Sequence, residues 1–455
     1  MKSIPVAGNN SSLILNLHSI LRPLDFMEKY NKQYGDFYRF IEKKNLSINI
    51  TSNPQAIREI LTMDSDVFDS GKANKSLSFL LGDNSLILLD GKDHKSRRRL
   101  LMPYFHGKFL EQCSQKIISI TNQVSDRLEV NQPFAVRPLM QEITLKVMLN
   151  LVFGIDSEQQ CQRLSNLLVE LLEIFNSPFK SLLIFFPILQ KDWGKYSPWG
   201  NFLSLKAEIK KLIYQKIKER QKLLIKEKSK CQDIFGLLIL AKDENGAGMT
   251  DEEVHDELIT LLFAGHETTA SALSWLFYWI HYHSEIEDKL RLETSLLGNV
   301  SDYQTINNLS YLNALIFETL RIYPVVVGSF ARIPNQDTYI MGYKINKNDY
   351  LSISIYNLHH REDLYPNSKQ FKPERFLETT YSPYEYLPFG GGNRRCLGSA
   401  LALLEMKLVT VTILKRFKLV LTNNHSLYPV RRGITLSPPA SFRMTVKNCV
   451  LGKNS

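Results

Sequence analysis

Apolar residues recur at every third or fourth position through most of residues 93–325. This spacing matches one face of an α-helix, so the pattern predicts a long series of amphipathic helices. Another helix is predicted directly after Cys396, where residues 399–417 are apolar on nearly every side and are therefore expected to be buried. Most of the chain is thus predicted to be helical.

Strand patterns are confined to short regions. Residues 36–51 contain two strand-like stretches, and a helix entered through Asn53 and Pro54 follows them. Residues 336–356 predict a second group of strands. We therefore expect a mainly α protein with small antiparallel β-sheets, which is an α+β fold.

The remaining segments contain no internal repeat and no low-complexity linker. Residues 70–90 and the proline-rich, aromatic stretch 365–392 are predicted to be loops. A chain of this length can bury a large core. Because no linker divides it, we expect a single domain over residues 1–455.

The composition is that of an ordinary globular protein, with 44% hydrophobic residues and a formal net charge of +10. A basic chain can bind nucleic acid, but no nucleic-acid motif is present, so we expect no such partner. The five cysteines include no CxxC pair, and their odd number argues against a disulfide framework. This usage favours a reducing compartment.

Residues 1–21 lack both the apolar core of a signal peptide and the roughly 20 apolar residues that cross a membrane. The longest apolar run, Leu182–Leu189, is also too short. We therefore expect a soluble, cytoplasmic protein with no membrane span. Residues 181–200 mix apolar and aromatic side chains, and these either pack in the core, cover a pocket entrance or touch a membrane surface.

Thr250 and Glu253 have the spacing of a capping box, and no proline interrupts the long helix predicted after them. Gly265, Glu267 and Thr268 then interrupt an otherwise apolar stretch. A hydroxyl that bonds back to a helical carbonyl can open the helix for a small ligand, with an acid and an alcohol nearby to deliver protons. The alternative is a solvated turn on a long amphipathic helix.

Two stretches that contain arginine carry weaker signals. Glu318 and Arg321 lie three positions apart on a predicted helix, close enough to pair. Such pairs usually lie in solvent and contribute little. Arg375 lies in a proline-bracketed stretch that by itself predicts a turn. Neither stretch alone indicates a function.

The stretch FGGGNRRCLG, residues 389–398, places Cys396 behind three glycines and two arginines at the start of a predicted helix. Glycines allow close approach to the backbone, and nearby positive charge lowers a thiol pKa and favours a thiolate. A phosphate cradle is disfavoured because the GxxxxGK[ST] spacing is missing. A nucleophilic cysteine needs a histidine partner, and no obvious one is present. The third alternative is a single thiolate as the axial ligand of haem iron.

In this order along the chain, these stretches resemble the motifs of the cytochrome P-450 family of haem-thiolate proteins. FGGGNRRCLG fits the FxxGxRxCxG haem-binding loop, AGHETTA fits the oxygen-activation motif of the central helix, and ETLR with PERF fits the paired motifs of a Glu-Arg-Arg network. The likeness covers essentially the whole chain. It implies the cytochrome P-450 fold, with haem b between the long central helix and the cysteine-bearing loop.

The resemblance also assigns residues to the cofactor. Cys396 would be the proximal ligand of the iron, and Phe389 would cover the sulfur. Gly392 and Gly398 would let the backbone approach the macrocycle. The set expected to contact the haem is Cys396, Phe389, Gly390, Arg394, Gly398, His94, Arg98, Arg332, Ala264 and Gly265, of which His94 and the three arginines would bind the propionates.

Catalysis and substrate binding would use other residues. The resemblance implies that Thr268 and Glu267 steer protons to the oxygen being reduced, and that Glu318, Arg321 and Arg375 form a buried structural network. Besides residues 70–90, the substrate pocket would be lined by Leu262, Phe263, Ala264, Val325, Val326, Val327, Ile434, Thr435 and Leu436. These side chains are small or apolar with no obvious charged anchor, which suits a fatty acid, an alkane or a terpenoid.

Together these implications describe a haem-thiolate monooxygenase that inserts one atom of O2 into a lipophilic substrate, with electrons ultimately from NAD(P)H. The sequence contains no flavin or iron–sulfur domain, so a separate ferredoxin or flavodoxin with its reductase is expected. An acidic partner of this kind would meet a basic surface made of Lys92, Lys95, Arg97, Arg99 and Arg395. Of these, Arg97 and Arg99 are expected to be solvated.

Two alternatives stay open. A peroxygenase or an isomerase of the same fold needs no acid–alcohol pair, and such relatives usually alter it, whereas Glu267 and Thr268 are both present here. A non-catalytic haem sensor is the second alternative. Steady product formation that depends on NAD(P)H and a ferredoxin would exclude the sensor.

Overall fold

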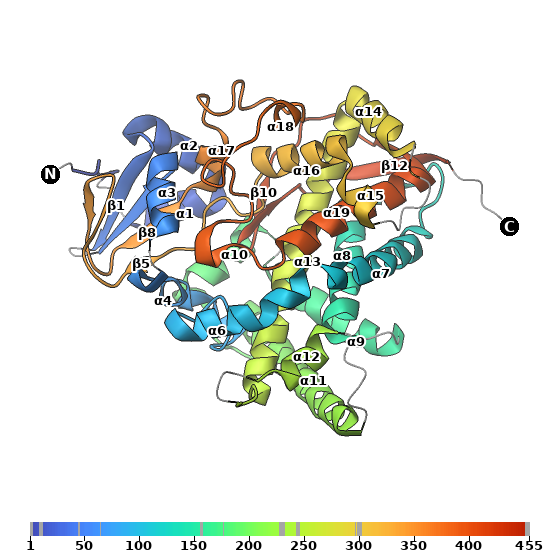
Figure 1. Ribbon diagram of the computed structural model, residues 1–455, viewed down its shortest axis with the longest axis horizontal. Helices are drawn as coiled ribbons and strands as arrows, with labels where there is room; N and C mark the ends of the chain where they lie inside the picture. The colour runs from blue at the N-terminus through green and yellow to red at the C-terminus, as the bar shows by residue number, and fades with distance from the viewer. Residues whose placement is uncertain are drawn as a thin grey trace.

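The structure is a computed structural model that describes residues 3–8, 12–43, 46–63, 65–154, 158–175, 177–226, 233–242, 246–295, 297 and 303–450. Figure 1 shows a mainly helical molecule in which strands β1, β5 and β8 gather on the side of the N-terminus. The helix α13 (Asp251–Tyr282) runs through the middle of the helical part. This arrangement confirms the predicted fold class.

The helices follow one another along most of the chain. In chain order the α-helices are α1 (Ser12–Leu21), α2 (Pro23–Tyr34), α3 (Pro54–Thr62), α4 (Ser70–Ala73), α5 (Ser78–Leu81), α6 (Gly91–Leu101), α7 (Lys108–Ser125), α8 (Val136–Phe153), α9 (Glu158–Glu173), α10 (Pro178–Phe185), α11 (Pro198–Lys226), α12 (Ile234–Leu240), α13, α14 (Ser284–Ser295), α15 (Tyr303–Asn307), α16 (Ser310–Ile322), α17 (Ile355–His359), α18 (Arg375–Glu378) and α19 (Ser399–Arg416). The 3-10 helices are η1 (Ser65–Val67), η2 (Lys75–Leu77), η3 (Met102–Phe105), η4 (Pro187–Leu189) and η5 (Gly392–Arg394).

The strands form several small sheets with the orders β1-β2-β8, β3-β5, β6-β7, β4-β12-β9 and β10-β11. Pairing is antiparallel, as predicted, except that β2 and β8 run parallel. The strands are β1 (Phe37–Lys43), β2 (Leu46–Thr51), β3 (Phe68–Asp69), β4 (Pro133–Ala135), β5 (Ile333–Pro334), β6 (Thr338–Ile340), β7 (Tyr343–Ile345), β8 (Tyr350–Ile353), β9 (Phe417–Leu421), β10 (Val430–Arg432), β11 (Thr435–Ser437) and β12 (Arg443–Cys449).

The predicted loop over residues 70–90 is wrong in its first half, which forms short helices. The Asp90 carboxylate accepts the backbone N–H of Gly71 at 2.7 Å and of Lys72 at 2.8 Å, at the start of α4. Helix α5 ends at Gly82, where a φ of 82° favours glycine. Each of these helices has only three or four residues, too few to show a helical period in the sequence.

Helix α13 begins at the predicted capping box, because the Thr250 hydroxyl accepts the Glu253 N–H while the Glu253 carboxylate accepts the Thr250 N–H. The helix is unbroken, so the expected opening beside Gly265 is not found. A Cβ atom at Gly265 would lie 2.5 Å from the Met148 sulfur on α8. The glycine therefore lets α8 pack closely on α13.

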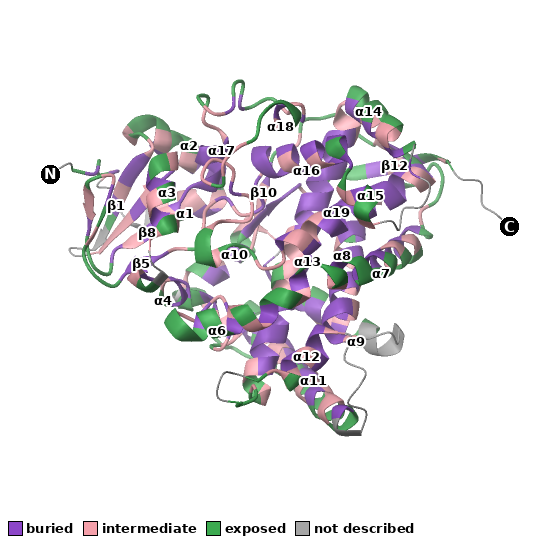
Figure 2. Ribbon diagram, viewed as in Figure 1, coloured by how far each residue is buried: buried purple, intermediate pink, exposed green. Residues whose placement is uncertain are grey.

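Burial follows the same arrangement (Figure 2): much of α13, α16 and α19 is buried, whereas α14 is largely exposed or half-exposed. The predicted burial of α19 is confirmed, and it includes the polar residues Glu405 and Lys407. None of the described helices is long and apolar enough to cross a membrane.

Candidate active site

A cavity of about 390 Å³ lies between α13 and the loop that carries Cys396. Ala264 and Thr268 line it from α13, and the cysteine lines it from the loop. Its wall is mainly apolar and includes Leu77, Phe79, Leu86, Ile87, Leu261, Phe263, Val325 and Val326. The fold therefore brings the central-helix motif and the cysteine motif together around one space.

The cysteine loop is shaped by its glycines. Gly390 and Gly392 both have a φ of 65°, a left-handed conformation that other residues rarely adopt. At Gly391 a Cβ atom would lie 2.6 Å from the Leu61 side chain, so this position has no room for one. The loop closes with the Cys396 N–H donating to the Phe389 carbonyl at 2.9 Å, just before α19 begins.

The Cys396 thiol lies in competing electrostatic surroundings. Burial raises its pKa, whereas a hydrogen bond from the Gly398 N–H and the positive charges of Arg98 and Arg395 lower it. The pKa is raised overall, so the sequence expectation of a depressed thiol pKa is wrong for the protein by itself. Burial outweighs the helix start and the two cations.

Cationic side chains gather along one side of the cavity. Arg394 donates to the Leu89 carbonyl and to the Asp90 carboxylate, both at 2.7 Å. Burial and the neighbouring Arg394 lower the pKa of Arg332 to about 10. Burial, Arg394 and Arg98 lower the pKa of His94 to about 4, so this imidazole is neutral at pH 7. All four residues predicted to hold propionates therefore line the same cavity.

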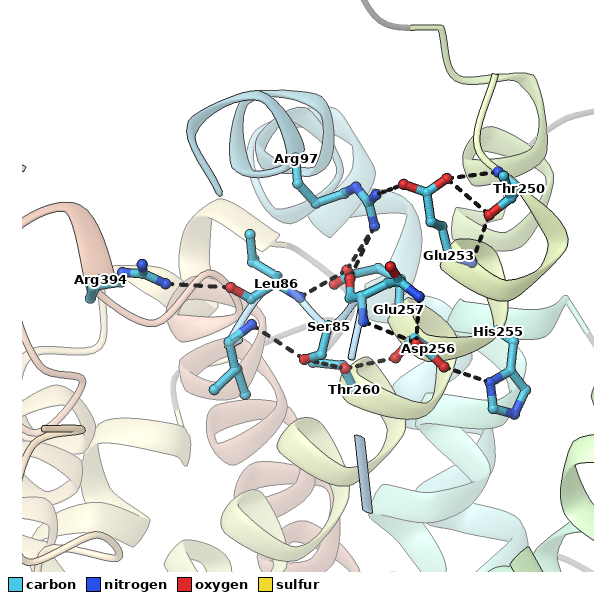
Figure 3. Close-up of polar contacts among 12 residues, drawn as sticks. Ser85, Leu86, Arg97, Thr250, Glu253, His255, Asp256, Glu257, Thr260 and Arg394 are labelled. Atoms are coloured by element: carbon cyan, nitrogen blue, oxygen red, sulfur yellow. Dashed lines mark hydrogen bonds and ion pairs between the residues drawn. The ribbon is translucent and has the colours of Figure 1, made fainter. Parts of the chain in front are cut away.

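Arg97 contradicts its prediction, because it is buried rather than solvated. Its guanidinium donates to the Glu253 carboxylate at 2.7 Å and to the Glu257 carboxylate at 3.4 Å, as Figure 3 shows. Lys92, Lys95, Arg99 and Arg395 are exposed. The predicted basic surface therefore lacks Arg97, which instead joins α6 to α13.

The same part of α13 fixes the chain at residues 84–86 (Figure 3). Asp256 accepts two hydrogen bonds from Asn84, and Glu257 accepts the Leu86 N–H at 3.2 Å. The Thr260 hydroxyl donates to the Ser85 hydroxyl at 2.7 Å. Burial raises the pKa of the Glu257 carboxyl to about 7, although Arg97 opposes this shift.

Glu257 was missed by the sequence reasoning, although it left a signal. It stands four positions before Leu261, on the face of the helix that continues through Ala264 and Thr268. An acid on that face has to be paired or neutral when it is buried.

The polar residues predicted at the centre of α13 lie next to the cavity but face different partners. The Thr268 hydroxyl donates to the Ala264 carbonyl at 2.5 Å. The Glu267 carboxylate accepts from Arg137 and from Gln141, both at 2.6 Å. Burial alone would raise the pKa of Glu267. Arg137, the neighbouring histidine and Gln141 outweigh this effect, so the pKa is lowered overall and the carboxyl is ionised.

The substrate wall stays a prediction, and the structure places part of it at the cavity. Phe263, Val325, Val326, Ile434 and Thr435 line the cavity.

Leu262, Val327 and Leu436 do not line the cavity, and their assignment is wrong. One residue along a helix is a rotation of about 100°, so Leu261 faces the cavity and Leu262 faces the core. Val327 and Leu436 pack together in a separate apolar cluster. The residues expected in the pocket included no obvious charged anchor, yet Arg432 and Glu173 also line the cavity.

The predicted Glu-Arg-Arg contacts are present. Glu318 and Arg321 are both 0% exposed and form two hydrogen bonds, at 2.6 and 2.9 Å. Arg375 donates to the same carboxylate at 3.1 Å. Arg321 also donates to the carbonyls of His359 and Gln370, so the network joins α16, α17 and the segment before α18.

Residues 181–200 do not pack wholly in the core. Ile188, Trp193 and Tyr196 are exposed, whereas Trp199 is buried against Phe79 and Phe202. Phe175 and Ile184, on either side of the start of this segment, line the cavity. Contact of the exposed side chains with a membrane stays a prediction.

The residues around the cavity fit a haem. Among the described residues Arg332 has no ion-pair partner, and its guanidinium reaches only the Phe330 carbonyl, at 3.4 Å. Nε of Arg394 is buried and has no hydrogen-bond partner in the described part of the chain. Buried cations of this kind need anions, and the two propionates of haem supply them. The Cys396 thiol lies across the cavity from α13 and can ligate iron. These features are those of a haem-thiolate protein.

Comparison with known proteins agrees. The family model for cytochrome P450 matches residues 5–445. "Putative cytochrome P450 135B1" of Mycobacterium tuberculosis is 32% identical over 444 residues, covering 97% of this chain and 90% of that protein. "Putative cytochrome P450 138" of the same organism is 29% identical, covering 98% and 96%. The solved structure of cyanobacterial CYP120A1 with retinoic acid bound has a TM-score of 0.84 at 26% identity, covering 99% and 100%.

The chain belongs to the cytochrome P450 family. It is accordingly a haem-thiolate monooxygenase, an oxidoreductase that uses haem and O2.

Proposed function

We propose that this monooxygenase oxidises a lipophilic substrate of the fatty acid, alkane or terpenoid class. The supporting observation is the cavity between Thr268 and Cys396, whose wall is mainly apolar. Apolar ligands gain roughly 25 cal/mol for each Å² of surface removed from water, so such a wall favours them. The ligand named for the cyanobacterial relative, retinoic acid, is itself a lipophilic molecule.

Cys396 would be the iron ligand of the haem, and His94, Arg98, Arg332 and Arg394 would hold its propionates. The bound haem supplies the centre at which dioxygen is bound and reduced. The protein supplies the positions of the acidic and basic groups around that centre. Neutral His94 can donate one ring N–H without adding another positive charge to the arginine cluster.

Thr268 would hand protons to the oxygen being reduced, and Glu267 would supply them. The Thr268 hydroxyl now donates to the Ala264 carbonyl, and it can rotate about its side-chain bond to donate into the cavity. Glu267 is held ionised by Arg137 and Gln141, so it acts by accepting a proton from the solvent side and passing it on.

Electrons would come from NAD(P)H through a separate ferredoxin or flavodoxin and its reductase. The exposed basic residues lie close to the haem-binding groups. Lys92, Lys95 and Arg99 are on α6, which also carries His94 and Arg98, and Arg395 directly precedes Cys396. A basic surface there would attract an acidic electron carrier, and added salt would weaken the attraction.

The test begins with the ferric, haem-loaded protein. It is titrated with fatty acids of graded chain length, alkanes and terpenoids while the Soret band is recorded. Ligands that shift the band are then incubated with NADPH, ferredoxin and reductase, and products are identified by mass spectrometry. Hydroxylated products that depend on NADPH support the proposal. A protein that binds none of these ligands, or binds them and forms no product, contradicts it and favours a sensor.

A further inference from the structure

Arg432 lies at the end of β10 and lines the cavity on the side of Arg137 and Glu173. The short turn after it is bound to the segment that follows α9 and to α10. The Gly433 N–H donates to the Phe175 carbonyl at 3.1 Å and to the Ser181 hydroxyl at 2.8 Å. The next residues, Ile434 and Thr435, also line the cavity. These contacts therefore hold the backbone next to Arg432 in place at the cavity wall.

Unlike its basic neighbours, Arg432 has no side-chain hydrogen-bond or ion-pair partner among the described residues. Arg137 pairs with Glu267 at 2.6 Å and also donates to Gln141. Arg431, the preceding residue, donates to the carbonyls of Ile20 and Ser19. Within the described part of the chain Arg432 makes no ion pair, and its Nε atom is buried with no hydrogen-bond partner.

The surroundings of Arg432 favour one kind of anion. Burial and Arg137 make its charge costly, while Glu173 and Glu267 lie near enough to favour that charge. Arg432 and Arg137 carry two positive charges and Glu173 and Glu267 carry two negative ones, so the geometry of the guanidinium, and not a surplus of positive charge, selects the ligand. The planar guanidinium can also donate two parallel hydrogen bonds to a carboxylate.

This site is separate from the cations assigned to the propionates. The charge of Arg394 lowers the pKa of Arg332, whereas the charges that act on Arg432 are those of Arg137, Glu173 and Glu267. The rest of the cavity wall is mainly apolar and includes Val325 and Val326.

We propose that Arg432 binds the carboxylate of the substrate, which makes the substrate a lipophilic carboxylic acid. The inference rests on the proposed function and narrows its substrate class from any lipophile to an amphipathic acid. It also corrects the sequence expectation that the pocket has no charged anchor.

The experiment compares dodecanoic acid, its methyl ester and dodecanol as ligands of the haem-loaded protein at pH 8. Affinity is measured from the Soret shift and, independently of the haem signal, by equilibrium dialysis of the radiolabelled compounds. The variants are Arg432→Met, which removes the charge, and Arg432→Lys, which keeps it. Arg431→Met is the matched control, because it removes a charge one residue away that does not line the cavity.

In the wild type we expect the acid to bind more tightly than the ester and the alcohol. Arg432→Met should weaken acid binding by about 10- to 100-fold, as for the loss of a charged hydrogen bond, and leave the ester within about twofold. Arg432→Lys should keep part of the preference, and Arg431→Met all of it.

Equal affinity for acid and ester in the wild type, or an unchanged preference in Arg432→Met, overturns the inference. Oxidation of neutral lipophiles would then leave the proposed function standing. If instead the acid binds through Arg432 and nothing is oxidised, the inference holds and the proposed function fails.

Discussion

The buried network around Glu318 allows a quantitative test of what holds α16, α17 and the segment before α18 together. In Glu318→Gln, the side chain keeps its size but loses its charge, and Arg321 and Arg375 lose the carboxylate that both contact. Arg321 is 0% exposed and Arg375 is 5% exposed, so neither guanidinium can turn to water. The remaining carbonyl contacts from His359 and Gln370 do not neutralise the two charges.

Breaking one partner out of a buried ion pair typically costs about 3–5 kcal/mol. At about 2.1 cal/mol/K per residue, the unfolding entropy of a 455-residue chain is about 1 kcal/mol/K. The expected fall in the thermal midpoint is therefore about 3–5 °C. It is measured on the haem-loaded protein by far-UV circular dichroism and by the loss of Soret absorbance.

Glu374→Gln is the matched control, because it removes the same charge from the residue beside Arg375. Glu374 pairs at 2.6 Å with Lys289, whose side chain is 53% exposed. Exposed pairs contribute about 0–1 kcal/mol, so the midpoint should move by no more than about 1 °C. A fall of less than about 1 °C in Glu318→Gln, or equal falls in both variants, would refute the argument from burial.

Three further predictions follow from single contacts. Thr268→Ala should raise the NADPH consumed per molecule of product, because no hydroxyl remains to pass protons; an unchanged ratio excludes that role. Gly82→Ala should lower the thermal midpoint by several degrees, because the new Cβ would lie 2.1 Å from the Asp256 carboxylate and the φ of 82° disfavours alanine. A midpoint within about 1 °C of wild type would contradict this clash. Burial raises the pKa of Glu257 to about 7 from an ordinary 4.5. As the pH rises, the unfolded chain therefore loses this proton before the folded protein does. The contribution of the residue to folding stability falls between those two pH values. Glu257→Gln should therefore gain thermal stability relative to wild type from pH 5 to pH 8, and a pH-independent difference would show that the carboxyl does not titrate there.

Much of this arrangement could be predicted from the sequence, because long elements repeat their period many times. Helix α13 has 32 residues and a capping box, and α19 has 18 residues that are apolar nearly all round. The short helices α4 and α5 have four residues each and depend on contacts with distant groups such as Asp90 and Asp256. Such contacts leave no local pattern.

The site was predicted where a motif fixes both residue type and spacing, and missed where pairing decides the environment. Cys396, Thr268 and the Glu318 network belong to motifs. The structure places Cys396 and Thr268 at one cavity and pairs Glu318 with Arg321 in the interior. Arg97 looks like part of a basic run, and only its contacts with α13 reveal that it is buried. Arg432 follows another arginine in the sequence, and only the tertiary fold shows that the two side chains face different surroundings.

Helix α13 also limits how the length of this chain can change over evolutionary time. Asp256 and Thr260 are bound to residues 84–85, while Thr268 faces the cavity two turns further on. One inserted residue between Thr260 and Thr268 would rotate everything after it by about 100° and advance it by about 1.5 Å. Either the hydrogen bonds from α13 to residues 84–85 would be lost, or Thr268 would no longer face the cavity. Insertions and deletions should therefore be tolerated in exposed turns such as residues 190–196, and not within this stretch of the helix.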